Sequence, residues 1–269
     1  MASARALSVL LVALGGCAHP RPGPDAAAPL ASVTVDDAGA PPRRALGYRA
    51  VRALDRVVAM TWGGGTRSAG ATCLGAWDTQ LVFDDVTVTG RVTGELPGRA
   101  ALALWDGTIT PRDNLFFLRA PVELAALVPA RYPLVGERGR VEVEAGGDER
   151  LRAVVRAALP ILPRAAIGVG ARWTVTAVDG AGTRRARWTL RAITGDRVTL
   201  AGTIDDVAPP PRPETVGWQS DGLGPWHRTT VQVAVDLAAF IVDAEVASHR
   251  GTGGWSEDTA ATLTIGPRR

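Results

Sequence analysis

The chain has 269 residues, 46% of them hydrophobic, and a formal net charge of +3 from 30 basic and 27 acidic residues. This length and composition can bury a substantial core and fit one large domain or two small ones. Every basic residue is an arginine, and the arginines are scattered among acids without a basic stripe, which argues against nucleic acid as a partner.

Residues 1–16 have the features of a secretory signal peptide. Arg5 and the amino terminus supply positive charge, and an apolar run of about ten residues follows, too short to span a bilayer. The motif Leu14-Gly15-Gly16-Cys17 resembles the lipobox of bacterial lipoproteins. The resemblance implies cleavage before Cys17 and acylation of Cys17. The alternative is a plain signal peptide, cut after another small residue, with Cys17 incidental.

The lipobox resemblance also implies a location. We expect the acyl chains on Cys17 to anchor the protein in a membrane of the cell envelope, because two or three chains hold a protein stably. Ala18 stands where many lipoproteins carry an aspartate that retains them in the inner membrane, which favours the outer membrane. Residues 17–45 are rich in proline, alanine and glycine, and they predict a disordered linker after the lipidated cysteine.

We expect residues 46–269 to form a single β-rich domain. Residues 56–62, 79–94 and 99–109 carry β-branched and aromatic residues between turn formers, as strands do. Valines at 86, 88 and 92, with Gly90, alternate with polar residues, which predicts a strand with one buried face. The glycines at 63–65 lack the lysine and spacing of a phosphate-binding loop, and they predict a flexible hairpin loop.

The period changes to that of a helix near residues 148–159. Asp148 can cap the helix, Glu149 suits its positive start, and Pro160 ends it. The apolar residues at helical spacing would share one face; they are Leu151, Val154, Val155, Ala158 and Leu159.

After this helix the sequence predicts an antiparallel meander over 171–205 and three further strands over 227–265. In the middle strand of the meander, Ala186, Trp188, Leu190 and Ala192 would face one side, and arginines and a threonine the other. We therefore predict a mainly antiparallel β (α+β) fold, a curved sheet or half-barrel with one covering helix near residues 148–159. Two packed sheet layers are the alternative.

The passage at 159–175 is the most family-like part of this domain. Prolines, then Ile167-Gly168-Val169-Gly170 and Trp173, resemble a pattern of uncharacterised bacterial lipoproteins, where it precedes a similar meander. The layout is also similar to the half-barrels of periplasmic lipoprotein carriers and lipid-binding lipoproteins. In those a helix closes a concave sheet that holds acyl chains, so the resemblance implies a hydrophobic ligand.

The sequence offers few residues for chemistry. It has neither G-x-S-x-G nor H-E-x-x-H, and we predict no catalytic residue, no metal site and no cofactor. Cys73 is interpreted as a free, buried apolar thiol rather than a reactive one. The pairs Asp84-Asp85 and Asp205-Asp206 are interpreted as turn formers at strand ends.

Tryptophans are the remaining signal. Trp173 and Trp188 are predicted to lie in the core, whereas Trp218, Trp226 and Trp255 lie in or beside glycine- and proline-rich loops. These three could form a rim for a ligand or partner, or they could cover the end of the sheet.

We expect a membrane-anchored, non-catalytic module that binds a hydrophobic ligand or an envelope partner. The alternative is an envelope enzyme using loop carboxylates or His227. An apolar pocket would favour binding, and convergent Asp, His and Arg with displaced pKa values would favour catalysis.

Overall fold

The computed structural model describes residues 31–268 except for gaps at 73–74, 97, 113–117, 121, 137–139, 145, 180–181, 208–225 and 253–254. The signal peptide, Cys17, Cys73 and Trp218 therefore lie outside the described residues. No helix in the described part of the chain is long and apolar enough to cross a membrane.

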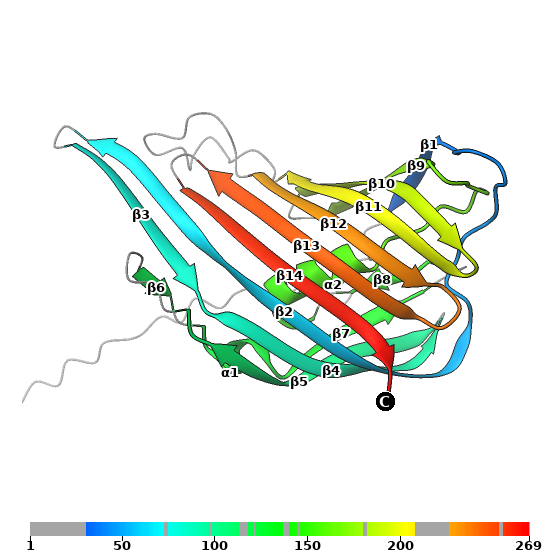
Figure 1. Cartoon of the computed structure of the whole chain (residues 1–269), viewed down its shortest axis with the longest axis horizontal. Helices are drawn as coiled ribbons and strands as arrows, with labels where there is room; N and C mark the ends of the chain where they lie inside the picture. The colour runs from blue at the N-terminus through cyan, green and yellow to red at the C-terminus, as the bar shows by residue number, and fades with distance from the viewer. Residues whose placement is uncertain are drawn as a thin grey trace, which may run out of the picture.

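The described strands form one 14-stranded sheet (Figure 1). Its main path runs β1-β9-β10-β11-β12-β13-β14-β2-β4-β5-β7-β8, with β3 beside β2 and β6 beside β3. All pairs are antiparallel except β3 with β6. The elements are β1 (Ser32–Asp37), β2 (Val51–Thr72), β3 (Gly75–Phe83), β4 (Asp85–Leu96), β5 (Arg99–Thr110), β6 (Leu118–Ala120), α1 (Leu124–Leu127), β7 (Ala130–Val135), β8 (Glu142–Val143), α2 (Glu149–Ala158), β9 (Arg172–Asp179), β10 (Gly182–Thr194), β11 (Arg197–Val207), β12 (Trp226–Asp236), β13 (Ile241–Thr252) and β14 (Trp255–Pro267).

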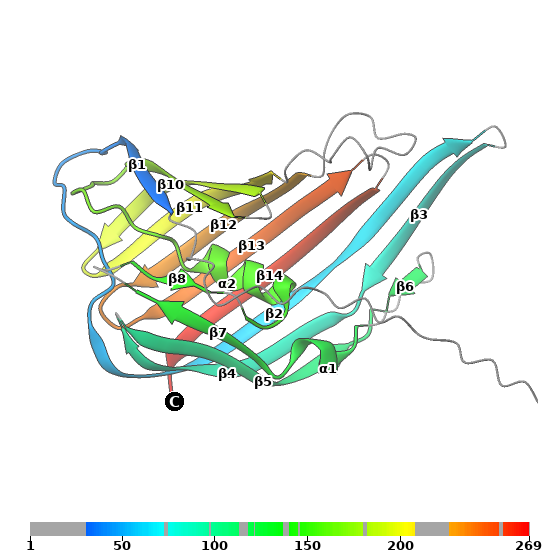
Figure 2. The same cartoon turned by 180° about the vertical axis from the view of Figure 1, so that it is seen from behind.

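The sheet is strongly curved, and α2 lies inside the curve. Seen from behind, α2 stands in front of β13 and β14 and next to β7 and β8, which return on its other side (Figure 2). Helix α2 contacts β12, β13, β14 and β8. The prediction of a curved antiparallel sheet covered by one helix near residues 148–159 is thus confirmed, and the single continuous sheet excludes two separate layers.

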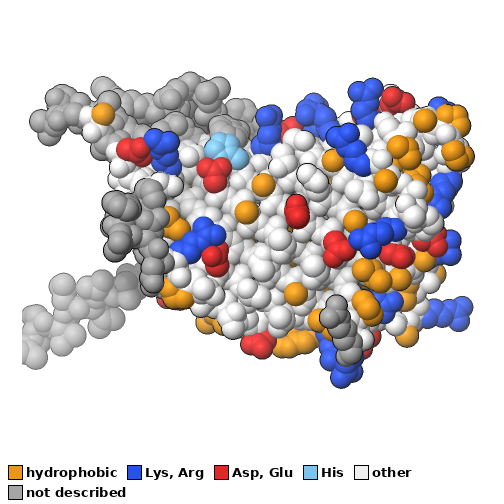
Figure 3. Space-filling model, in the orientation of Figure 1, with side chains coloured by type: hydrophobic (Ala, Val, Ile, Leu, Met, Phe, Trp, Pro, Cys, Tyr) orange, Lys and Arg blue, Asp and Glu red, His pale blue; other side chains and the backbone are white. Residues whose placement is uncertain are grey.

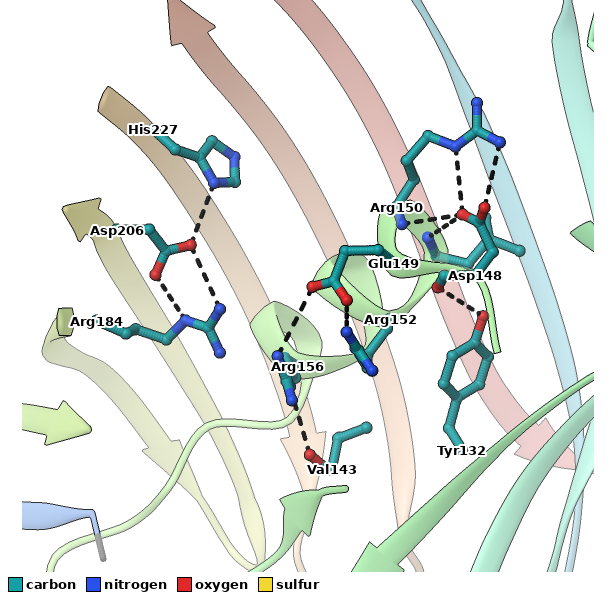
Figure 4. Close-up of polar contacts among 11 residues, drawn as sticks. Tyr132, Val143, Asp148, Glu149, Arg150, Arg152, Arg156, Arg184, Asp206 and His227 are labelled. Carbon is teal, nitrogen blue, oxygen red and sulfur yellow. Dashed lines mark hydrogen bonds and ion pairs between the residues drawn. The ribbon is translucent and has the colours of Figure 1, made fainter. Parts of the chain in front are cut away.

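Helix α2 is fixed at both ends. The Asp148 carboxylate accepts hydrogen bonds from the backbone N–H groups of Arg150 (2.9 Å) and Leu151 (3.3 Å), which confirms the predicted cap. The buried Tyr132 hydroxyl donates to the Asp148 carbonyl at 3.2 Å (Figure 4), and the buried Tyr48 hydroxyl donates to the Pro160 carbonyl at 3.2 Å. Burial raises the pKa of both tyrosines. The helix is therefore held in place against the sheet.

The linker prediction is wrong for its second half. Residues 32–37 form β1, which pairs with β9, and Val33 and Val35 pack against the core. Arg44 and Ile167 then exchange two backbone hydrogen bonds of 3.0 and 2.9 Å. Residues 31–45 thus belong to the folded domain, because a short alternating stretch inside a proline-rich segment pairs with the edge of the sheet.

The family-like passage at 159–175 has a structural role. A Cβ on Gly168 would lie 1.8 Å from the Ala40 carbonyl oxygen, so only glycine lets the two segments approach. The Trp173 indole is fully buried, as predicted, and donates to the Ile161 carbonyl at 3.0 Å. The motif therefore packs closely against residues 38–44 and hydrogen-bonds to them just before β9 begins.

Two local predictions are corrected. Gly63–Gly65 do not form a hairpin loop but lie within β2 and pair with β14. A Cβ on Gly64 would lie 2.2 Å from the Asp258 carbonyl oxygen, and one on Gly65 would lie 2.5 Å from the Leu81 carbonyl oxygen, which explains glycine at these two positions. Ala192 faces outward because the register shifts between Leu190 and Ala192, and this irregularity reverses the alternation.

Candidate functional site

A cavity of about 140 Å³ lies between α2, β8 and the inner face of β9 to β12. Its walls are mainly apolar and include Val143, Leu159, Val175, Ala186, Trp188 and Ile204. A cavity of roughly 150 Å³ lined by apolar groups holds one benzene molecule. The space therefore suits a single ring or a short alkyl chain.

Side-chain size on the inner face explains where this cavity forms. The indole of Trp188 stacks on that of Trp173, with 6.5 Å between ring centroids, and it lies across Gly202 of the neighbouring strand. Beyond Trp188 on the same face, β10 carries Ala186 and β9 carries Ala177. These small residues leave room under α2 that a larger aliphatic side chain would occupy.

A polar cluster of Arg184, Asp206 and His227 borders the cavity (Figure 4). Arg184 donates to Asp206 through Nε (2.7 Å) and Nη2 (3.4 Å), and His227 Nδ1 lies 3.1 Å from Asp206 Oδ2. Burial disfavours ionisation of Asp206, but the hydrogen bonds from His227 and Arg184 outweigh it and lower the pKa of this carboxyl. Asp206 is therefore a carboxylate at neutral pH.

Hydroxyl groups extend the polar cluster to β13. Thr229 Oγ1 lies 3.2 Å from His227 Nε2 and 2.9 Å from Ser248 Oγ. The connected chain Arg184–Asp206–His227–Thr229–Ser248 thus crosses four adjacent strands, β10 to β13. Thr229 is only 5% exposed.

The described part of the outer face carries ion pairs and an open hollow rather than a recessed cavity. Figure 3 shows charged side chains of both signs spaced across this face. Asp205, for example, pairs with Arg187 (3.0 Å) and Arg228 (2.9 Å). A shallow hollow across β11 to β2 is lined largely by small residues such as Ala247 and Thr262. Because this hollow is shallow, whereas the cavity is recessed between α2 and the sheet, we place the candidate site on the inner face.

The two aspartate pairs, Asp84-Asp85 and Asp205-Asp206, lie in or beside strands rather than in turns. Asp84 is buried between β3 and β4, which both run antiparallel to β2 one after the other, so no turn forms there and that interpretation is wrong; Asp85 forms an ion pair with Arg112 at 2.6 Å. Asp205 and Asp206 lie inside β11, so their interpretation as turn formers is wrong. Across the described ranges, no three His, Cys, Asp or Glu residues are grouped so that they could hold a metal ion.

The predicted tryptophan rim is only partly described. Trp226 begins β12 and pairs with Gly251, and Trp255 begins β14, so both backbones lie at the end of the sheet that carries His227. The half-buried Trp255 ring has the Arg250 guanidinium 5.4 Å from its centroid. The side chain of Trp226 and all of Trp218 lie outside the described residues, and the rim stays a prediction.

Sequence reasoning missed Arg184 and Thr229, although the signal was present. Arg184 has the same parity as Ala186 and Trp188, which the alternation placed on the apolar face. A charged residue in that register is the unusual feature that marks the site.

Comparison with known proteins does not identify the chain. It matches no protein-family model, and no curated protein matches its sequence. A solved structure described as "lipid-protein interactions in lipovitellin" matches with a TM-score of 0.42 and 10% identity. The match covers 80% of this chain but 26% of that one, so this chain spans about a quarter of that chain's length.

Proposed function

We propose that this protein is an envelope lipoprotein whose β domain binds a small apolar or amphipathic ligand, without catalysing a reaction. The observation that carries the proposal is the cavity between α2 and the sheet. It is largely apolar, with a few polar groups at its border, as ligand pockets usually are.

Packing energetics support a ligand in this cavity. Protein interiors are filled about as densely as organic crystals, and an unfilled apolar space costs stability. Here the space persists beneath a helix that Tyr48 and Tyr132 hold at both ends. A ring or short chain would fit this space and contact its apolar walls.

The lipobox motif supports the anchoring part of the proposal. Acylation of Cys17 would tether the domain to the envelope, with the outer membrane favoured by Ala18. Metabolic labelling with radioactive palmitate tests this directly. Wild-type protein should be labelled and should sediment with membranes, and Cys17→Ser should abolish the label. Unlabelled wild-type protein would refute the anchor.

Native mass spectrometry of the full chain, isolated from an envelope-containing host, tests the binding function. We expect a bound small molecule that is lost on denaturation. Ala186→Leu, which fills the cavity, should remove that mass, whereas Ala247→Leu on the outer face should retain it. A ligand-free wild-type mass would instead favour an envelope protein as the partner, bound at the end of the sheet that carries Trp255.

A second candidate function, ester hydrolysis, is favoured by one observation. Thr229, His227 and Asp206 have the connectivity of a hydroxyl–His–Asp triad. It ranks second because Thr229 is nearly buried and lies in a strand paired on both sides, so backbone N–H groups beside it serve the sheet rather than an oxyanion. Hydrolysis of p-nitrophenyl butyrate that His227→Gln abolishes would promote this function to first place.

A further inference from the structure

The cluster at the cavity border occupies an unusual place for charge. On β10, Arg185 and Arg187 point outward and are exposed, whereas Arg184 shares the inner face with the buried Ala186 and Trp188. The side chains of Arg184, Asp206 and His227 are 32%, 29% and 26% exposed. They are therefore partly buried, and all three line the cavity.

Stability alone does not account for a charged cluster at this place. A partly buried ion pair must offset the cost of removing both charges from water, and apolar residues of similar size are often as stabilising. The neighbouring inner-face positions of the same strands are apolar, as at Ala186, Ile204 and Val231. A role in ligand recognition would explain why charge replaces that pattern beside the cavity; the Arg250–Glu257 pair on β13 and β14 is a second place where the inner face carries charge.

Hydrogen-bond accounting shows what the cluster offers to a ligand. Asp206 already accepts from two Arg184 nitrogens and lies within hydrogen-bond distance of His227 Nδ1. A guanidinium carries five N–H groups. Among the described residues, Arg184 donates to Asp206 alone, through Nε and Nη2. Asp206 thus fixes the plane of the guanidinium, and its remaining N–H groups can donate to water or to a ligand. A ligand end that accepts hydrogen bonds would fit this cluster.

Planarity and charge narrow the class of acceptor. A guanidinium matches the two oxygens of a carboxylate, and such charge-assisted bonds are about twice as strong as neutral ones. On the other side of the cavity, the Arg156 guanidinium is engaged with the Val143 carbonyl at 3.3 Å and with Glu149 at 3.8 Å (Figure 4). Both arginines have partners, but Arg184 shares the inner face of β10 with Ala186 and Trp188 and keeps N–H groups beyond those that Asp206 accepts, so we place the ligand head group there.

We infer that the cavity takes a carboxylic acid with a short apolar tail or a single ring, its carboxylate on Arg184 and its tail against Ala186 and Trp188. This inference rests on the proposed binding function and names the ligand class. The volume of about 140 Å³ limits the buried tail to about the size of benzene.

Hexanoate and 1-hexanol are the probes, because they share a tail and differ in the head group. The full chain carrying Cys17→Ser, which removes the acylation site, is titrated with each probe by ligand-observed NMR. We expect this parent protein, in which all the cavity residues are unchanged, to bind hexanoate at least tenfold more tightly than 1-hexanol. Arg184→Met should remove this difference, and Arg185→Met, on the outer face of the same strand, should leave it unchanged.

Arg184→Lys is a second variant in case Arg184→Met does not fold. Lysine keeps a positive charge beside Asp206 but lacks the planar guanidinium that binds two oxygens at once. We expect it to melt like the parent and to bind hexanoate at least threefold more weakly. Equal binding of both probes to the parent protein, or equal losses for both in Arg184→Met, would overturn the carboxylate assignment and leave the apolar cavity as a binding site. If neither probe binds, the proposed binding function fails with it.

Discussion

A larger side chain that fills the cavity should raise stability and lower ligand affinity, so it tests whether the cavity is a binding site. Ala186 lies on the inner face of β10 and lines the cavity of about 140 Å³. Ala186→Leu adds three carbon atoms, worth about 2.4 kcal/mol if all three are buried. Loss of rotamer freedom offsets about 0.5 to 1 kcal/mol of this, so the free energy of unfolding should rise by about 1.5 kcal/mol. The Tm should then rise by roughly 3 to 6 °C.

The same substitution should weaken ligand binding. The leucine occupies space for three methylene groups of a bound tail, which corresponds to about 50-fold lower affinity for 1-hexanol. Thermal melting and an NMR titration measure the two effects on one preparation. Ala247→Leu, on the exposed outer face of β13, should change the affinity by less than about twofold. A leucine at 186 that leaves 1-hexanol binding intact would refute this cavity as the binding site.

Three further substitutions, one of them with a control, test the residues that hold α2 and the cavity walls in place. Tyr132→Phe removes the hydrogen bond at the start of α2, so the free energy of unfolding in urea should fall by about 1 kcal/mol and amide hydrogen exchange in the helix should be faster. Unchanged exchange would show that this hydrogen bond does not hold the helix. Gly202→Ala places a Cβ 2.6 Å from the Trp188 ring and should lower the free energy of unfolding by about 1 to 3 kcal/mol, whereas Gly266→Ala, with open space around it, should be tolerated. Asp206 has a lowered folded pKa, so it stabilises the fold above its unfolded pKa of about 3.9, and this contribution is lost as the pH falls through the folded value. Between about pH 5 and pH 2, the urea midpoint of wild type should therefore fall more steeply than that of Asp206→Asn, and parallel curves would show that the lowered pKa is wrong.

Local sequence determined the elements of this protein. The alternation at Val86, Val88 and Val92, the cap at Asp148 and the helical face from Leu151 to Leu159 all reflect periods of two or 3.6 residues, which act within one segment. The same periods determined that the sheet has one apolar face, and hence that the helix covers it. Because Cys17 lies outside the described residues, its acylation still rests on the sequence motif.

Tertiary structure decided what the local periods leave open. Residues 32–37 became a strand because β9 offered an edge, and Gly63–Gly65 stayed in a strand because β14 pairs with them. Asp206 met Arg184 and His227 across β10, β11 and β12, although these residues are 21 or more positions apart in the chain. Register between strands sets such neighbours, and register depends on the packing of the whole sheet. The sequence thus determined that a charged residue stands on the apolar face of β10, and only the folded sheet placed it beside a cavity.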